Sequence, residues 1–220
     1  MTISELLDAR AAAARDWALA QLQLSDASFE PASADASFRR YFRIRAGERS
    51  WVLMDAPPEK ENCQPFIHVA GLMAAAGINA PRIHAQDLAR GYLLLSDLGR
   101  QTFLHVINES NADELFAAAI DALILWQRSS RPGVLPDYDD ALLRRELGLF
   151  PDWYVAQHLR RELATHQRQR LDAVNDHLVQ SALAQPKVFV HRDYMPRNLM
   201  ISTPNPGVLD FQDAVYGPIT

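Results

Sequence analysis

The spacing of apolar residues divides the first half of the chain into a leading helix and a group of strands. Apolar side chains recur at helical spacing over residues 3–24, which predicts an amphipathic helix. Residues 29–54 instead alternate or form short apolar runs around a turn, which predicts antiparallel strands. A second helix that ends at a glycine and two more strands follow, at residues 66–76, 81–85 and 91–95.

The pattern becomes almost wholly helical near residue 98. Three segments carry an apolar face of helical period; they are residues 112–126, 138–159 and 167–184. Short strands return at residues 188–190, 199–201 and 208–209. This change predicts an α+β fold, with an antiparallel-sheet N-terminal lobe over residues 1–97 and a mainly helical C-terminal lobe over residues 98–220.

Composition and charge narrow the class of protein. The 220 residues are 48% hydrophobic and 22% charged, as in an ordinary globular chain, and the net charge of −5 argues against a nucleic-acid-binding surface. The sequence has no run of about 18 apolar residues, the length needed to cross a membrane. The lone Cys63 cannot form an internal disulfide. We therefore expect a cytoplasmic protein with neither a nucleic-acid nor a membrane partner, and no oligomeric state is predicted.

A polar loop between two predicted strands carries the candidate chemistry. Residues His191 to Asn198 have the form H-R-D-x-x-x-x-N. In phosphoryl transfer, the aspartate of such a loop, here Asp193, orients the attacking hydroxyl and accepts its proton, while the asparagine reaches a magnesium ion. Twelve residues after Asn198, Asp210 begins a D-F motif whose carboxylate suits magnesium. We expect His191 to brace the backbone rather than to transfer a proton.

Each of these residues alone would be ordinary in a turn or a helix cap. Their joint spacing, with strands on both sides and a hairpin before Asp210, favours a kinase instead. The motifs resemble those of the aminoglycoside phosphotransferase and choline kinase superfamily, which has the two-lobe fold of protein kinases. Within it, the chain is most similar to bacterial N-acetylmuramate/N-acetylglucosamine kinases. That closer likeness covers most of the chain and rests on residues 35–43, 54–58, 94–99, 191–200 and 209–214.

The resemblance implies an ATP- and Mg²⁺-dependent sugar kinase. It would transfer the γ-phosphate to the anomeric hydroxyl of an N-acetyl amino sugar, a step of peptidoglycan recycling. Asp193 would be the catalytic base, and Asn198 and Asp210 would be the metal ligands. The hinge that contains Leu95 and Asp97 would hold adenine through its backbone. Members of the family ordinarily continue into further helices, so we expect this chain to be a fragment.

The superfamily's phosphate-binding lysine has no counterpart in the sequence. The third predicted strand, residues 51–54, contains no lysine, and the 22 basic residues comprise 20 arginines and only two lysines, Lys60 and Lys187. We therefore expect an arginine to bind phosphate, since guanidinium binds it bidentately. The candidates are Arg39, Arg40 and Arg43.

A glycine-rich cover over the phosphates is also missing. Backbone N–H groups of the segment that contains Ser37 and Phe38, together with the Ser37 hydroxyl, would have to replace it. On the acceptor side, Arg197 would pair with the lactyl carboxylate of N-acetylmuramate or with the γ-phosphate, or else brace the loop. Asp213 would approach the substrate or cap a turn. Two alternatives stay open: a kinase for choline, an aminoglycoside or another metabolite, and a nucleotide-binding pseudokinase that serves as an interaction module.

Overall fold

The computed structural model describes residues 3–33 and 38–219, and the side chains of residues 3–8 and 33 lie outside what it describes. Its helices are α1 (Ile3–Leu22), α2 (Gln64–Ala75), α3 (Phe103–Val106), α4 (Ala112–Arg128), α5 (Asp140–Leu149), the π-helix η1 (Phe150–His158), α6 (Thr165–Leu183) and the 3₁₀-helix η2 (Pro196–Asn198). Its strands are β1 (Ser28–Ser33), β2 (Arg40–Ala46), β3 (Arg49–Asp55), β4 (Ile83–Asp87), β5 (Tyr92–Ser96), β6 (Lys187–Val190), β7 (Leu199–Met200), β8 (Gly207–Val208) and β9 (Val215–Pro218).

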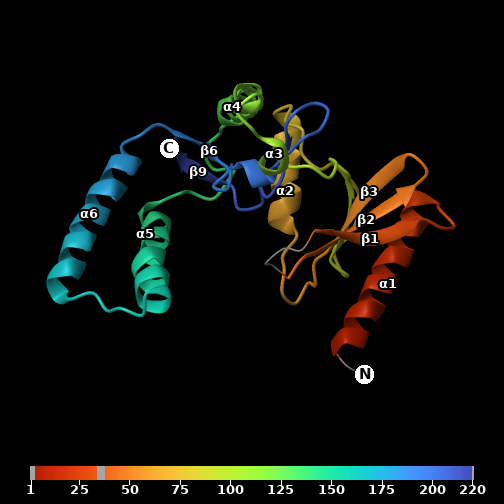
Figure 1. Ribbon diagram of the computed structural model, residues 1–220, viewed down its shortest axis with the longest axis horizontal. Coiled ribbons are helices and arrows are strands. Elements are labelled where there is room, and N and C mark those ends of the chain that lie inside the picture. Colours follow the sequence, from red (N-terminus) through yellow and green to blue (C-terminus); the bar gives the residue numbers. More distant parts are fainter. Residues whose placement is uncertain (1–2, 34–37, 220) are drawn as a thin grey trace. The chain divides into compact units, whose positions relative to one another are not determined.

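Five strands form one antiparallel sheet in the order β1-β2-β3-β5-β4, with α1 beside it (Figure 1). The predicted α+β class is thus confirmed, and the predicted helices and strands are observed with ends that differ by a few residues. The sequence pattern missed α3 and β9, and it did not separate the π-helix η1 from α5. None of the helices in the described part of the chain is both long and apolar enough to cross a membrane.

The sheet has two different faces because successive side chains of a strand point to opposite sides. On one face, Ile44, Leu53 and Leu94 are buried in a cluster with Trp17 and Ala18 of α1. Their immediate neighbours in β2, β3 and β5 line a pocket instead; these are Arg43, Val52 and Leu95. The amphipathic α1 therefore covers the apolar face of the sheet, and the opposite face lines the pocket.

A buried carboxylate adds charge pairing to this packing. Asp55, at the end of β3, has no exposed surface. Arg10 of α1 donates to its Oδ1 from Nε at 2.8 Å, and Arg40 of β2 donates to its Oδ2 from Nε at 3.0 Å and Nη2 at 2.5 Å. A buried charge is stable only when it is paired in this way. The sequence prediction of Arg40 as a phosphate-binding candidate thus falls on a residue that is bound to Asp55.

The described residues divide into two compact units. One combines Met1–Leu123 with Asp193–Asp213, and the other combines Ile124–Arg192 with Ala214–Thr220. The sheet ends at Ser96 and helix α3 begins at Phe103, so the change from strands to helices near residue 98 is observed. Because the compact units do not divide at that point, the lobe limits of 1–97 and 98–220 stay a prediction.

The second unit is built on a two-stranded ladder. Strand β6 pairs with β9 in antiparallel fashion, and the rings of Phe189 and Trp126 pack with their centroids 4.8 Å apart. Helices α5 and α6 lie side by side (Figure 1), joined by the ion pair of Arg144 with Asp176 at 2.6 Å. Trp126 is buried, whereas Trp153 of η1 is 67% exposed.

Gly91 provides a test of the packing before β5. Its φ is +74°, and a Cβ there would lie 1.8 Å from the carbonyl oxygen of Ala56. We expect Gly91→Ala to lower the free energy of unfolding by about 3 kcal/mol or more, from left-handed backbone strain plus overpacking. Gly77 has a similar φ of +79° but open space around it, so Gly77→Ala should cost only about 1–2 kcal/mol. Equal losses for the two variants in urea denaturation would contradict the steric argument.

Candidate functional site

A pocket of about 410 Å³ lies within the first compact unit, on the face of the sheet that α1 does not cover. Val52 and Leu95 of the sheet contribute apolar surface, and Met200 and Leu209 contribute more from the C-terminal hairpin. The backbone that leaves β5, residues 95–99, forms another part of the lining. The lining therefore combines apolar surface with a stretch of main chain and a few polar groups.

Asn198 and Asp210 bring the polar groups to this pocket. Asn198 ends the short helix η2, and its Nδ2 donates to the backbone oxygen of Asp193 at 2.9 Å and to Oδ2 of Asp210 at 3.2 Å. The other carboxylate oxygen of Asp210 accepts from Nε2 of Gln212 at 2.9 Å. Both predicted metal ligands thus lie side by side in the pocket, and their spacing in the sequence is converted into contact by the β7–β8 hairpin.

The backbone at Asp210 is strained. Its φ is +60°, a left-handed conformation that a non-glycine residue keeps only where surrounding contacts hold it. The next residue, Phe211, is fully buried and packs on Phe66 of α2 with ring centroids 4.8 Å apart. The turn therefore buries the aromatic ring while the neighbouring carboxylate stays exposed at the pocket.

Other contacts fix the hairpin that carries Asp210. Asn79 follows α2, and its Nδ2 donates to the backbone oxygen of Pro204 at 2.6 Å, while its own backbone oxygen accepts from Val208 N at 2.7 Å. A Cβ at Gly207 would lie 2.8 Å from Ser202 Oγ and 2.9 Å from Leu98, so a larger residue there would have to displace these two side chains. The metal-ligand candidates are thus held by the first unit's own framework.

Asp193, the predicted base, does not line the pocket, although its backbone oxygen binds Asn198. The next residue is anchored, because the Tyr194 hydroxyl donates to the backbone oxygen of Ala119 in α4 at 2.7 Å. Burial raises the pKa of Tyr194 to about 12, so the hydroxyl stays protonated and available as a donor at neutral pH. Asp213, the second acceptor candidate, is also outside the lining and exposed, 3.4 Å from Nε2 of Gln212.

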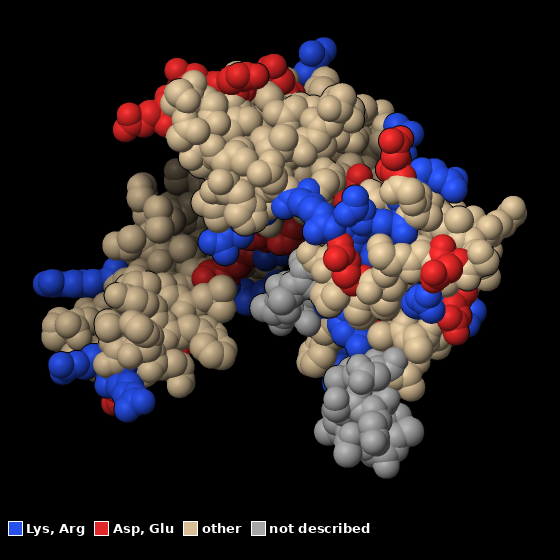
Figure 2. Space-filling view, turned by 45° about the vertical axis from the view of Figure 1, so that its right-hand side comes forward, with Lys and Arg blue, Asp and Glu red and all other residues tan. Residues whose placement is uncertain are grey.

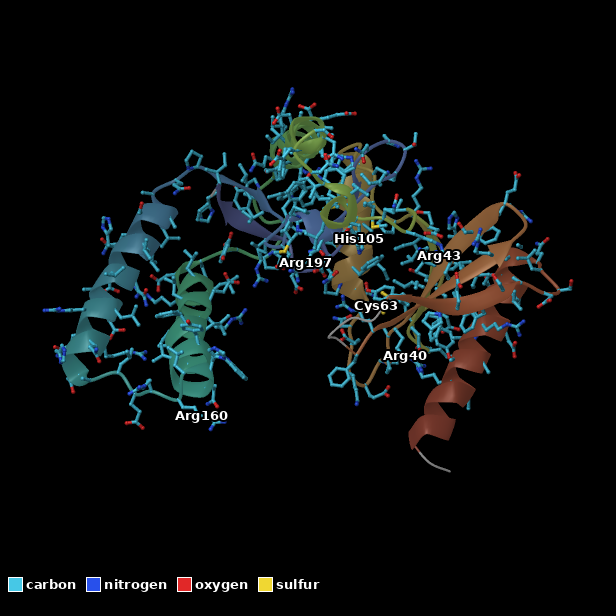
Figure 3. The ribbon with its side chains drawn as sticks, in the orientation of Figure 1. Arg40, Arg43, Cys63, His105, Arg160 and Arg197 are labelled. Carbon is cyan, nitrogen blue, oxygen red and sulfur yellow. The ribbon has the colours of Figure 1, made fainter. Side chains whose placement is uncertain are left out.

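The three arginines expected near the phosphates all have carboxylate partners. Arg43 is buried and donates to Asp97 from Nε at 2.7 Å and from Nη2 at 3.1 Å, and it also binds the backbone oxygen of Gly99 at 2.7 Å. Arg39 pairs with Glu61 at 3.1 Å, and Arg40 pairs with Asp55. Only Arg43 of the three lines the pocket (Figure 3). A phosphate role for any of them stays a prediction.

The expected phosphate cover is only partly described. Ser37 lies outside the described residues. Phe38 is exposed, its backbone N–H approaches Oε1 of Glu61 at 3.3 Å, and Lys60 lies over its ring at 4.3 Å from the centroid. The N–H of Phe38 therefore already has an acceptor in this structure.

Arg197 differs from the other arginines of the pocket. Its side chain is exposed at the pocket and forms no hydrogen bond or ion pair with any other residue in the described part of the chain. Arg100, which also lines the pocket, is paired with Glu30. An unpaired guanidinium one residue before Asn198 is available to an anionic group of a bound molecule.

His105 is a pocket residue that the sequence did not single out, because a lone histidine in a short helix carries no recognisable pattern. Its Nδ1 accepts the backbone N–H of Thr102 at 3.2 Å and lies 2.9 Å from the Thr102 hydroxyl. Since Nδ1 is an acceptor, the neutral ring carries its hydrogen on Nε2, which is the donor left for a ligand. Figure 3 shows His105 with Arg197 and Arg43.

Charged side chains elsewhere on this surface are mixed in sign. In Figure 2, acidic side chains gather along the upper edge of the view, and Lys and Arg side chains are distributed over other parts of the same face. This face of the molecule therefore has no uniform positive charge, and positive charge at the pocket comes from the arginines that line it.

The chain matches a known protein family and several named relatives. Residues 28–220 match the family model described as the phosphotransferase enzyme family. Proteins named N-acetylmuramate/N-acetylglucosamine kinase are similar to the chain: one from Pseudomonas aeruginosa is 63% identical over 90% of the chain and 59% of its own length. A second from Neisseria meningitidis is 46% identical over 86% of the chain and 58% of its own length. The chain thus spans about three-fifths of the length of the curated relatives it matches.

Solved structures are similar in fold at low sequence identity. Choline kinase LicA from Streptococcus pneumoniae matches with a TM-score of 0.63 and 11% identity, over 91% of this chain and 68% of that one. APH(2″)-IIa in a ternary complex with streptomycin and ATP matches with a TM-score of 0.61 and 14% identity, over 94% of this chain and 72% of that one. The expected kinase-like fold is confirmed by these likenesses.

The pairing of Asp97 with Arg43 gives a pH-dependent prediction. Burial alone would raise the pKa of Asp97, but hydrogen bonds from Arg43 and from the Gly99 N–H outweigh it and lower this pKa. A carboxyl group whose pKa is lower in the folded than in the unfolded protein stabilises the fold at pH values above its unfolded pKa of about 3.9. This contribution is lost as the pH falls through the folded pKa. We expect Asp97→Asn to be less stable than the unchanged protein at pH 7, with a difference that shrinks below about pH 4. Hydrogen exchange of the sheet amides would measure it, and a difference independent of pH would contradict the assignment.

Proposed function

Because the chain belongs to the phosphotransferase enzyme family, we propose that it is an ATP-dependent kinase acting on the anomeric hydroxyl of N-acetylmuramate and N-acetylglucosamine. The observation that carries the phosphoryl-transfer part is the contact of Asn198 with Asp210 at one end of the pocket, where Asp210 is held in a left-handed backbone conformation. The names of relatives up to 63% identical support the choice of acceptor.

The pocket suits a nucleotide base. The apolar side chains of Val52, Leu95, Met200 and Leu209 would contact the faces of adenine, and the main chain at residues 95–98 would offer donors and acceptors for its edge. His105 lines the same pocket, and its Nε2–H would bind a hydroxyl or phosphate oxygen of the nucleotide. The side chain of Asp97 would then act indirectly, because it is engaged by Arg43 and by the Gly99 N–H.

The ligand atoms that Asn198 and Asp210 bring to the pocket fit Mg²⁺. A carboxylate and an amide oxygen are hard ligands, and Mg²⁺ in such sites is commonly bound through one or two carboxylates together with substrate phosphates. Asp210 and Asn198 would hold the ion, which when bound neutralises charge on the phosphates. Among the side chains that the structure describes, no group of three His, Cys, Asp or Glu is suited to a metal; phosphate oxygens and water would complete the coordination.

Asp193 would act as the base. As the anomeric oxygen bonds to the γ-phosphorus, the bond from that phosphorus to the bridging oxygen of ADP breaks, and the hydroxyl proton passes to the Asp193 carboxylate. Positioning and electrostatic stabilisation account for most of the rate enhancement in this chemistry. The bond from Asn198 to the Asp193 backbone couples the base to the metal-ligand candidates, since one side chain contacts both.

Arg197 favours an acidic acceptor over a cationic one. An unpaired guanidinium beside the reacting groups would attract the lactyl carboxylate of N-acetylmuramate or a phosphate, and it would repel the quaternary ammonium of choline or the amines of an aminoglycoside. The exposed Asp213 would contact the sugar hydroxyls. A cytoplasmic kinase of this kind would return cell-wall sugars to biosynthesis.

The first test measures ADP release from ATP and Mg²⁺ with N-acetylmuramate, N-acetylglucosamine, choline and an aminoglycoside as acceptors. We expect release with the two amino sugars and loss of the reducing end of the sugar, because phosphorylation blocks the anomeric carbon. Asp193→Ala should lower the rate on the order of a thousandfold or more, since it removes the carboxylate that would orient the acceptor hydroxyl and accept its proton. ATP-dependent thermal stabilisation without turnover would favour a nucleotide-binding pseudokinase instead, and turnover of choline alone would overturn the acceptor assignment.

A second test separates the roles of Arg197. If it binds the lactyl carboxylate, Arg197→Ala should reduce kcat/KM for N-acetylmuramate about tenfold or more while changing that for N-acetylglucosamine little, because a charge-assisted hydrogen bond contributes about 1.5–3 kcal/mol. Arg82→Ala serves as the control, because Arg82 follows the lining residue Pro81 in the sequence but does not itself line the pocket. Equal losses on both sugars would rule out carboxylate recognition and indicate a phosphate contact.

A further inference from the structure

A hydrogen-bonded cluster in the second compact unit holds the residue that immediately precedes Asp193. Its members are Tyr138, Glu146 of α5 and Arg192. The Tyr138 hydroxyl donates to Oε2 of Glu146, and Nη2 of Arg192 donates to Oε1 of the same carboxylate. The side chains of Arg192 and Glu146 are 24% and 29% exposed, so this ion pair is better shielded than a surface pair. Glu146 therefore uses both of its oxygens to bridge Tyr138 and Arg192.

Tyr138 is itself fixed by the strand ladder. Its backbone N donates to the oxygen of Tyr216 in β9 at 2.8 Å, and the Tyr216 N donates to the oxygen of Pro136 at 2.8 Å. Gly217 allows this approach, because a Cβ there would lie 2.3 Å from the Cβ of Tyr138. Strand β9 pairs with β6, which runs directly into His191 and Arg192. The contacts thus form a closed ring from β6 through β9, Tyr138 and Glu146 back to Arg192.

This ring of contacts includes Arg192, whose backbone conformation is strained. Its φ is +75°, in the left-handed region that an arginine adopts only at an energetic cost. Such a conformation persists where surrounding contacts determine it. The ion pair with Glu146 fixes the side chain of Arg192, and the β6–β9 ladder fixes the chain just before it. The conformation of the residue that is covalently joined to Asp193 is thereby fixed.

We propose that Glu146 is a positioning residue for phosphoryl transfer, which holds Arg192 in its left-handed conformation and so orients the adjoining Asp193. The proposal rests on the proposed role of Asp193 as the base. Tyr138 supports it by occupying the second oxygen of Glu146. Burial, with the Glu146 carboxylate beside it, raises the pKa of Tyr138 to about 12, so the hydroxyl remains a donor through the neutral range.

The proposal predicts an effect on turnover rather than on nucleotide binding. None of Tyr138, Glu146 and Arg192 is among the residues that line the pocket. Loss of the Glu146 charge leaves the pocket's own groups in place but releases the strained Arg192 backbone. Misplacement of a reacting group by about 1 Å can lower a rate on the order of a hundredfold. The KM for ATP should therefore change much less than kcat.

The experiment compares Glu146→Gln with the unchanged protein. We expect kcat on the amino sugar to fall about ten- to a hundredfold, with the KM for ATP altered by no more than about twofold. Asp140→Asn makes the same carboxylate-to-amide change on the same helix, in an exposed pair with Arg144, and should leave kcat unchanged. An unchanged kcat for Glu146→Gln, or equal losses in the two variants, would overturn the proposal.

A double-mutant cycle tests whether Glu146 acts through Arg192. If it does, Glu146→Gln combined with Arg192→Gln should lose no more activity than the worse single variant. Losses that multiply would show independent roles and contradict the proposal. Should Glu146→Gln fail to fold by circular dichroism, Tyr138→Phe removes only one hydroxyl and should still lower kcat severalfold at constant KM for ATP; an unchanged kcat there would count against the ring.

Asp193→Ala, assayed beside these variants, separates the two proposals. If Asp193→Ala keeps its activity, the assignment of the base is wrong and the positioning role falls with it. If Asp193→Ala is inactive while Glu146→Gln turns over normally, the kinase assignment stands and only the positioning role is lost.

Discussion

The two-residue alternation of the sheet is the constraint on which the first compact unit depends. Because neighbouring side chains of a strand face opposite ways, each strand of β2, β3 and β5 must supply apolar groups to α1 and ligand-facing groups to the pocket in turn. Arg43 is the consequence: it lies beside Ile44 of the core, yet it faces the pocket and is buried there. A buried guanidinium needs a carboxylate, and Asp97 supplies it just beyond the end of β5.

The same pairing is found for the other two arginines that the sequence analysis considered for phosphate binding. With only two lysines in the chain, arginines carry nearly all positive charge, and a planar guanidinium binds a carboxylate with two parallel hydrogen bonds. Arg39, Arg40 and Arg43 are each drawn to a carboxylate of a neighbouring element. Arg197 lies on a short loop helix with no carboxylate partner in the described residues, and this difference makes it the pocket's available cation.

Local features of the chain were predictable from its sequence, whereas long-range pairings were not. The helical period of residues 112–126 and the loop from His191 to Asn198 are encoded by neighbouring residues. The sequence therefore predicted α4 and a loop that carries both Asp193 and Asn198. Strand β9 is short, contains Gly217 and Pro218, and forms only because β6 lies beside it. The partner of Arg43 is 54 residues away in the sequence, and that of Arg192 is 46 residues away. The spacing of neighbouring residues therefore could not predict either ion pair.

The division of the chain into units has a consequence for its synthesis on the ribosome. The first unit is discontinuous: its N-terminal part, Met1–Leu123, is completed by Asp193–Asp213, which is translated only after most of the second unit. Domains fold as units while the chain emerges, N-terminal parts first. The nascent sheet and α1 can therefore assemble early, but the pocket gains Asn198 and Asp210 only near the end of translation of these 220 residues. Until then, the nascent chain lacks both of these polar side chains.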